Sequence, residues 1–81
     1  MDARQYVVVL EPETVGGFSV TVPALPEVVT QGESVDEALV NVREAIELAL
    51  EVRRDEGEEL PPSDVDGARI EKVSVSIPPA A

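Results

Sequence analysis

The chain has 81 residues, a net charge of −11 from 17 acidic and 6 basic side chains, and neither histidine nor cysteine. These absences exclude disulfides, thiolate metal sites and imidazole acid–base chemistry, so we expect neither an enzyme nor a metal or cofactor. The charge repels nucleic-acid phosphates and anionic lipids, and no apolar run is long enough to cross a bilayer. We therefore expect an acidic, cytoplasmic protein that binds neither nucleic acid nor membranes directly.

Strand patterns fill the first third of the chain. Residues 5–11, QYVVVLE, are apolar on both faces, which predicts a strand at the centre of its sheet. Gly16 and Gly17 supply the backbone freedom of a hairpin turn. Residues 18–22 then alternate between apolar and hydroxyl side chains, so the first two strands are expected to form an antiparallel hairpin.

A joint of unusual composition links the sheet to a helix. Pro23 and Pro26 end the second strand and bracket a turn, and residues 28–32 resume as a short third strand. Ser34 and Glu37 match the S-x-x-E capping box that opens helices. We expect a structural role for the residues that specify this joint: Pro23, Pro26, Gly32, Ser34 and Glu37.

A helix is the element that the sequence predicts most firmly. From Val35 onward apolar residues recur at intervals of three and four and form one stripe: Val35, Ala38, Leu39, Val42, Ala45, Ile46, Ala49 and Leu50. Gly57 is a candidate for the C-terminal cap. An acidic loop follows at 58–68, and alternation at 69–77 predicts a last strand with Val73, Val75 and Ile77 on one face.

The element order predicts an α+β fold of type β-β-β-α-β, with an antiparallel-rich sheet and one helix on one face. We expect a single domain over residues 1–81. A domain this small buries only around 60–65% of the surface that its unfolded chain exposes, so self-association into a homo-oligomer is also expected.

Four segments of the chain form one long pattern with fixed spacing: GGFSVTVPALP at 16–26, TQG at 30–32, SVDEAL at 34–39 and EAIELAL at 44–50. In these segments the chain resembles the HicB-like antitoxin family, in its N-terminal domain and in the form of a short UPF0150-type protein. The resemblance implies a partly degraded ribonuclease H-like fold. It also implies an antitoxin that binds and occludes a small basic mRNA-cleaving toxin of the HicA type.

Two departures from the family pattern stand out. Glu27 occupies the position after LP where glycine is usual, and Val28 follows where cysteine is common. The C-terminal DNA-binding domain of full-length family members has no counterpart after Pro78, so DNA binding is not expected here.

Apolar and acidic residues on the helix side opposite the stripe are candidates for a partner surface. Val40, Glu44 and Leu48 form one i, i+4, i+8 row, with Glu47 and Glu51 beside it. Val7 and Val9, on the outer face of the first strand, are candidate oligomer contacts. Either the loop at 58–68 or another subunit is expected to cover that face.

Two alternatives remain open beside a toxin-binding module. One is an orphan homo-oligomeric HicB-like domain that has no toxin. The other is a residual metal-dependent nuclease, in which several acids must converge on paired cations. The acids available for such a centre are Glu11, Glu13, Asp64 and Asp66.

Overall fold

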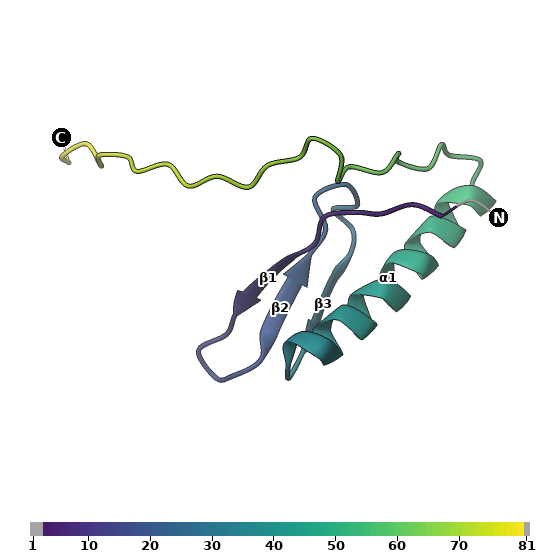
Figure 1. Cartoon of the computed structure of the whole chain (residues 1–81), viewed down its shortest axis with the longest axis horizontal. Coiled ribbons are helices and arrows are strands. Elements are labelled where there is room, and N and C mark those ends of the chain that lie inside the picture. Colours follow the sequence, from purple (N-terminus) through teal and green to yellow (C-terminus); the bar gives the residue numbers. More distant parts are fainter. Residues whose placement is uncertain (1–2, 81) are drawn as a thin grey trace.

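A computed structural model describes residues 3–80, and within that range it contains three strands and one helix. They are β1 (Val9–Pro12), β2 (Phe18–Thr21), β3 (Val29–Gly32) and α1 (Val35–Asp55). The strands form one antiparallel sheet in the order β1-β2-β3, and α1 packs along β3 and β2 (Figure 1). The predicted α+β arrangement of three strands followed by a helix is confirmed.

The first two strands form the predicted hairpin. Leu10 lies opposite Val20, and Pro12 lies opposite Phe18. The turn is closed by a hydrogen bond from the Glu13 amide to the Gly17 carbonyl at 3.0 Å. Gly16 and Gly17 have φ values of +100° and +76°, which other residues rarely adopt, so the glycine pair is required by the backbone of this turn.

The prediction of a long, central first strand is wrong. Pairing begins only at Val9, and β1 lies at an edge of the sheet instead of at its centre. The upstream residues bind another segment: the Val7 amide donates to the Asp64 carboxylate at 2.7 Å, and the Tyr6 hydroxyl donates to the Pro61 carbonyl at 2.6 Å. Apolar residues on both faces of a segment indicate that both faces can be buried. They do not indicate which strands pair with the segment, and so they do not distinguish a central strand from an edge strand.

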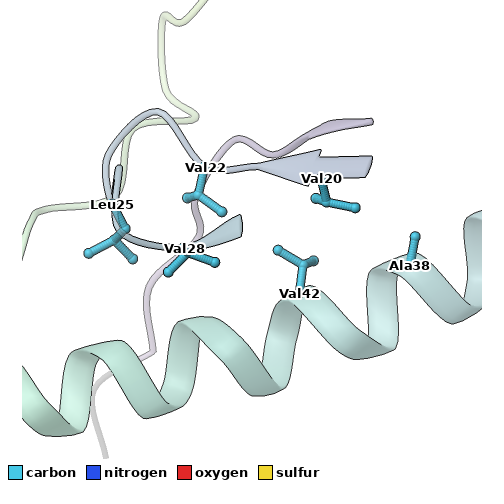
Figure 2. Packing of buried hydrophobic residues seen from close by; sticks show 6 residues of the cluster. All are labelled: Val20, Val22, Leu25, Val28, Ala38 and Val42. Atoms are coloured by element: carbon cyan, nitrogen blue, oxygen red, sulfur yellow. The ribbon is translucent and has the colours of Figure 1, made fainter. Parts of the chain in front are cut away.

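The joint between β2 and β3 consists of two tight turns. The Leu25 amide donates to the Val22 carbonyl at 3.0 Å, and the Val28 amide donates to the Leu25 carbonyl at 2.9 Å. These turns direct Val22, Leu25 and Val28 inward, where each side chain is buried (Figure 2). Pro23 and Pro26, which lack an amide donor, stay at the surface between them.

The passage from β3 into α1 depends on close backbone packing. Gly32 is buried, and a β-carbon on it would lie 2.6 Å from the Ala38 α-carbon, nearer than real β-carbons approach. Ser34 caps the helix, because its hydroxyl accepts a hydrogen bond from the Glu37 amide at 3.1 Å. A capping box has two hydrogen bonds, and within residues 3–80 the structure shows the one that the Ser34 hydroxyl accepts.

One hydrophobic core lies between the sheet and α1. Figure 2 shows its six buried side chains, contributed by the sheet, the joint and the helix: Val20, Val22, Leu25, Val28, Ala38 and Val42. Ala45, Ile46, Ala49 and Leu50 continue the predicted stripe and pack against this core while half-buried. Val35 and Leu39 are more exposed, at 47% and 43%.

The C-terminal end of α1 is a Schellman motif. The Gly57 amide donates to the Arg54 carbonyl at 3.0 Å, and the Glu58 amide donates to the Arg53 carbonyl at 2.9 Å. Gly57 has φ +77°, the left-handed conformation that this motif requires. The predicted cap is confirmed, and it turns the chain back toward the N-terminal segment.

The predicted last strand at 69–77 is not formed. Within the described residues, 69–77 belong to no strand, every side chain there is exposed, and the segment runs away from the sheet and helix (Figure 1). A turn at Asp66 and Gly67, with Gly67 at φ +77°, precedes this departure. Alternation reports which side chains share a face, and it does not supply the neighbouring strand that a ladder needs.

Candidate protein-binding groove

A shallow groove of about 500 Å³ runs between the second half of α1 and the segment that enters β3. Its walls are largely apolar, with charged groups at one end. We call it the α1–β3 groove and define it by its lining residues: Glu27, Val28, Val29, Ala45, Leu48, Ala49, Val52, Arg53, Glu56 and Glu58.

The helix supplies one wall because its apolar residues extend beyond the core stripe. Leu48 and Val52 are one turn apart, so they lie on the same side of α1. Leu48 is 63% exposed and Val52 is 48% exposed. Val29 belongs to the sheet face turned away from α1, borders the groove at its outer rim and is 69% exposed. Leu48 and Val52, with Val29 at the rim, form an apolar surface that a partner would desolvate.

The sheet supplies the other wall through the Leu25–Val28 turn. Val28 is buried and anchors the segment to the core, which leaves the next residue, Val29, turned to the outside. Further along, the Asn41 amide group donates to the Gln31 carbonyl at 2.8 Å and holds the helix against the outer edge of β3.

A bidentate ion pair closes the charged end of the groove. Arg53 Nε donates to Glu27 Oε2 at 2.7 Å, and Arg53 Nη2 donates to Glu27 Oε1 at 2.8 Å. The hydrogen bonds from Arg53 lower the pKa of the Glu27 carboxyl below that of a free glutamate. The Glu27 carboxylate in turn raises the pKa of the Arg53 guanidinium. The unusual residue at position 27 thus fixes the joint to the end of α1.

The surroundings of the groove are acidic. Glu56 and Glu58 line it directly. Residues 33–59 carry ten acids against three bases, so negative charge is concentrated on and after the helix. Such a field favours a cationic partner and speeds its encounter.

The predicted partner residues separate into three positions. Leu48 lies in the α1–β3 groove, whereas Glu47 and Glu51 line a smaller hollow of about 260 Å³ on another side of the helix, with Leu50, Arg54 and Leu60. Val40, which is 58% exposed, and Glu44 are exposed on α1 outside both hollows.

Val29 and Val52 were missed as site residues. Val52 continues the row of Leu48 at i+4, so helical spacing alone could have identified it. Val29 could not be identified in this way, because its position beside Leu48 depends on how the helix lies against β3.

The candidate oligomer contacts lie at and just before the start of β1. Val7 and Val9 are both half-buried. Val9 is paired with Thr21, which in turn pairs with Val29, so these three residues share the sheet face turned away from α1.

The acids considered for a metal centre occupy separate places. Glu11 and Glu13 are exposed at the hairpin, whereas Asp64 binds the Val7 amide near the start of β1. Among residues 3–80 no three acidic side chains gather in a geometry that could hold a metal ion. In the same range no helix combines the length and the apolar character needed to span a membrane.

Comparison with known proteins identifies similar chains. A family model described as the HicB_like antitoxin of bacterial toxin-antitoxin systems matches residues 6–76. A UPF0150 protein of Thermoplasma acidophilum is 39% identical over 57 residues, which cover 70% of this chain and 83% of that protein. A UPF0150 protein of Archaeoglobus fulgidus is 44% identical over 50 residues, covering 62% and 72%.

A longer relative carries an antitoxin name. The antitoxin HicB 1 of Photorhabdus laumondii is 39% identical over 57 residues, which cover 70% of this chain but only 37% of the antitoxin. The similarity therefore concerns about a third of that protein.

Proposed function

The chain belongs to the HicB-like antitoxin family, and from this premise we propose that it is an antitoxin that binds and occludes a small basic toxin of the HicA type. The α1–β3 groove is the observation that carries the proposal. It joins exposed apolar side chains to an acidic surround, which suits a partner with an apolar anchor in a basic surface.

The apolar part of the groove would supply affinity. Leu48 and Val52 lie in the groove and Val29 lies at its rim, and the helix and strand already hold their backbones, so binding would have to order only their side chains. An apolar toxin side chain inserted against Leu48 and Val52 would lose contact with water. We place the anchor of the interface here.

The charged residues would supply attraction and orientation. Glu44, Glu47 and Glu51 are exposed on α1 outside the groove, and Val40 extends the exposed surface toward the start of α1. Exposed acids raise the association rate of a cationic partner more than they raise its final affinity, and salt screens them.

Inhibition by occlusion requires no catalytic group in the inhibitor. A non-enzymatic role therefore suits a chain without histidine or cysteine. The toxin would lose activity because its RNA substrate is excluded, both sterically and by the acidic field that repels phosphates.

The test titrates the full chain into a small basic RNA-cleaving toxin of the HicA type from the same organism, with RNA cleavage and binding measured together. We expect stoichiometric loss of cleavage. Leu48→Asp is expected to weaken binding at least about tenfold, as at an interface hot spot. The matched control is Val15→Asp, because Val15 is 95% exposed in the hairpin turn, at the opposite end of the sheet from Val29.

Two results would overturn the proposal. A toxin that stays fully active in excess of this chain would exclude the antitoxin function and favour an orphan homo-oligomer. Equal weakening by Leu48→Asp and Val15→Asp would leave the function standing but remove the groove as its site.

A further inference from the structure

The segment at 69–77 is an unpaired strand sequence. Val73, Val75 and Ile77 alternate with two serines and are 82%, 74% and 83% exposed. In an extended chain these three side chains share one face. Such a segment pays the full cost of exposed apolar surface unless a sheet edge accepts it.

Within residues 3–80, β1 and β3 are the two edge strands of the sheet. The β3 edge is partly covered, because α1 packs along β3 and Asn41 donates a hydrogen bond to the Gln31 carbonyl. On β1, the Glu13 amide is hydrogen-bonded to the Gly17 carbonyl, and in an antiparallel pair every second residue is bonded across the ladder. Leu10, opposite Val20, falls at a position that is not bonded across, so its backbone N–H and C=O point away from β2. Within residues 3–80 no strand pairs with that edge of β1.

Apolar side chains of β1 and of the residues just before it are only partly covered. Tyr6, Val8 and Leu10 contact the core yet stay half-buried, because α1 packs along β3 and β2. Across from them, the side of α1 opposite the α1–β3 groove carries Leu39, which is 43% exposed, and the half-buried Leu50. A strand added to β1 would place its apolar face between these two rows.

Charge favours the body of the same protein as the acceptor. Residues 68–80 contain two bases and one acid, whereas residues 1–67 together with Ala81 contain four bases and 16 acids. The segment thus has a net charge of +1, against −12 for the rest of the chain. Its charge is locally complementary to the acidic body that would accept it.

We infer that residues 69–77 form a strand on the β1 edge of a second copy of this chain, reciprocally in a closed dimer. The Asp66–Gly67 turn sends the segment away from its own sheet (Figure 1), so a second copy can accept it without a change in that turn. Exchange of one element between two copies gives a two-fold dimer with no unpaired edge left at β1. This inference is independent of the toxin-binding function.

The first measurement is mass in solution, by light scattering on the full chain over a concentration range. We expect a dimer. Val75→Asp is expected to weaken dimerisation at least about tenfold, because a charge would replace a valine that becomes buried in the inferred dimer. Ser76→Asp, which adds the same charge on the opposite face, is the matched control and is expected to change it less than about threefold. A monomeric wild-type chain, or equal effects of the two variants, would overturn the inference.

The second measurement separates exchange from folding back. Since the chain has no cysteine, Glu11→Cys and Ser74→Cys can be placed in separate chains, one of them isotope-labelled. Both positions lie on the sheet face turned away from α1 in the inferred dimer. A mixed disulfide between labelled and unlabelled chains is expected, and a Ser76→Cys chain covers a shift of register. A chain that carries both Glu11→Cys and Ser74→Cys serves as the comparison. If a disulfide forms within that chain and none forms between the two single-cysteine chains, the segment pairs with its own β1, and the inference is overturned.

Discussion

The Arg53 guanidinium and the Glu27 carboxylate join two segments 26 residues apart through a pair of hydrogen bonds of 2.7 and 2.8 Å. One segment is the turn that leads into β3, and the other is the last part of α1. The planar fork of arginine matches a carboxylate in a way that lysine does not. This pair therefore ties the joint to the helix end at the charged end of the α1–β3 groove.

Replacing either partner should expose this coupling. We expect Glu27→Gln and Arg53→Gln each to lower the free energy of unfolding, and the double variant to lose less than the sum of the two. The effects should be modest and should shrink at high salt, because the pair is accessible to solvent. Arg53→Lys is the matched control for geometry, since it keeps the charge and loses the fork. Additive effects at low salt would contradict the coupling.

The same pair should make stability depend on acid pH. The pKa of Glu27 is lowered in the folded state, chiefly by the hydrogen bonds from Arg53, so the unfolded chain binds the proton more tightly. The stabilisation is therefore fully present above the pKa of Glu27 in the unfolded chain, about 4.3, and it is lost as the pH falls through the lower pKa of Glu27 in the folded protein. Carboxyl NMR titration should show the Glu27 pKa rising in Arg53→Gln. An unchanged Glu27 pKa in that variant would contradict the assignment.

Substitution of Gly32 should be costly although the residue carries no side chain. A β-carbon there would meet the backbone of Ala38, which α1 holds in place. We expect Gly32→Ala to lower the free energy of unfolding by about 1–3 kcal/mol, measured by urea denaturation. Gln31→Ala, at the exposed neighbouring position, should stay within about 0.5 kcal/mol. Equal stability of the two variants would show that the strand and helix can separate freely here.

Loss of the helix cap should cost less. Ser34→Ala removes the acceptor of the Glu37 amide and is expected to destabilise the protein by about 1 kcal/mol. Ser34→Asp keeps an acceptor and should retain most of the stability. A thermal melt of both variants beside the wild type makes the comparison, and identical melting of Ser34→Ala and wild type would argue against the cap.

The largest loss is expected at Leu25, whose side chain is fully buried in the joint. Leu25→Ala should cost about 2–5 kcal/mol, through lost burial and the cavity left behind. Leu48→Ala makes the same chemical change at a side chain that is 63% exposed, and should cost far less. Leu25→Val provides a smaller truncation if the alanine variant is unfolded. Comparable losses at positions 25 and 48 would contradict the assigned core.

The sequence by itself determined the elements whose signals are local. The glycine pair of the hairpin, the serine cap, the helix from Val35 and the terminal Gly57 each depend on interactions within a few residues. Local backbone preference and helical periodicity therefore predicted them. The same periodicity placed Leu48 outside the core stripe, which made it a candidate contact before its surroundings were known.

Only the tertiary structure decided the features that depend on residues far apart in the chain. Alternation in residues 69–77 does not specify a partner strand, so the unpaired segment and the edge position of β1 were not predictable from it. The groove arises where Leu48 and Val52 of α1 lie beside the segment that enters β3, and the Glu27–Arg53 pair arises where the joint meets the helix end. Both follow from how α1 packs along β3, which is fixed by the buried Gly32, Leu25 and Val28.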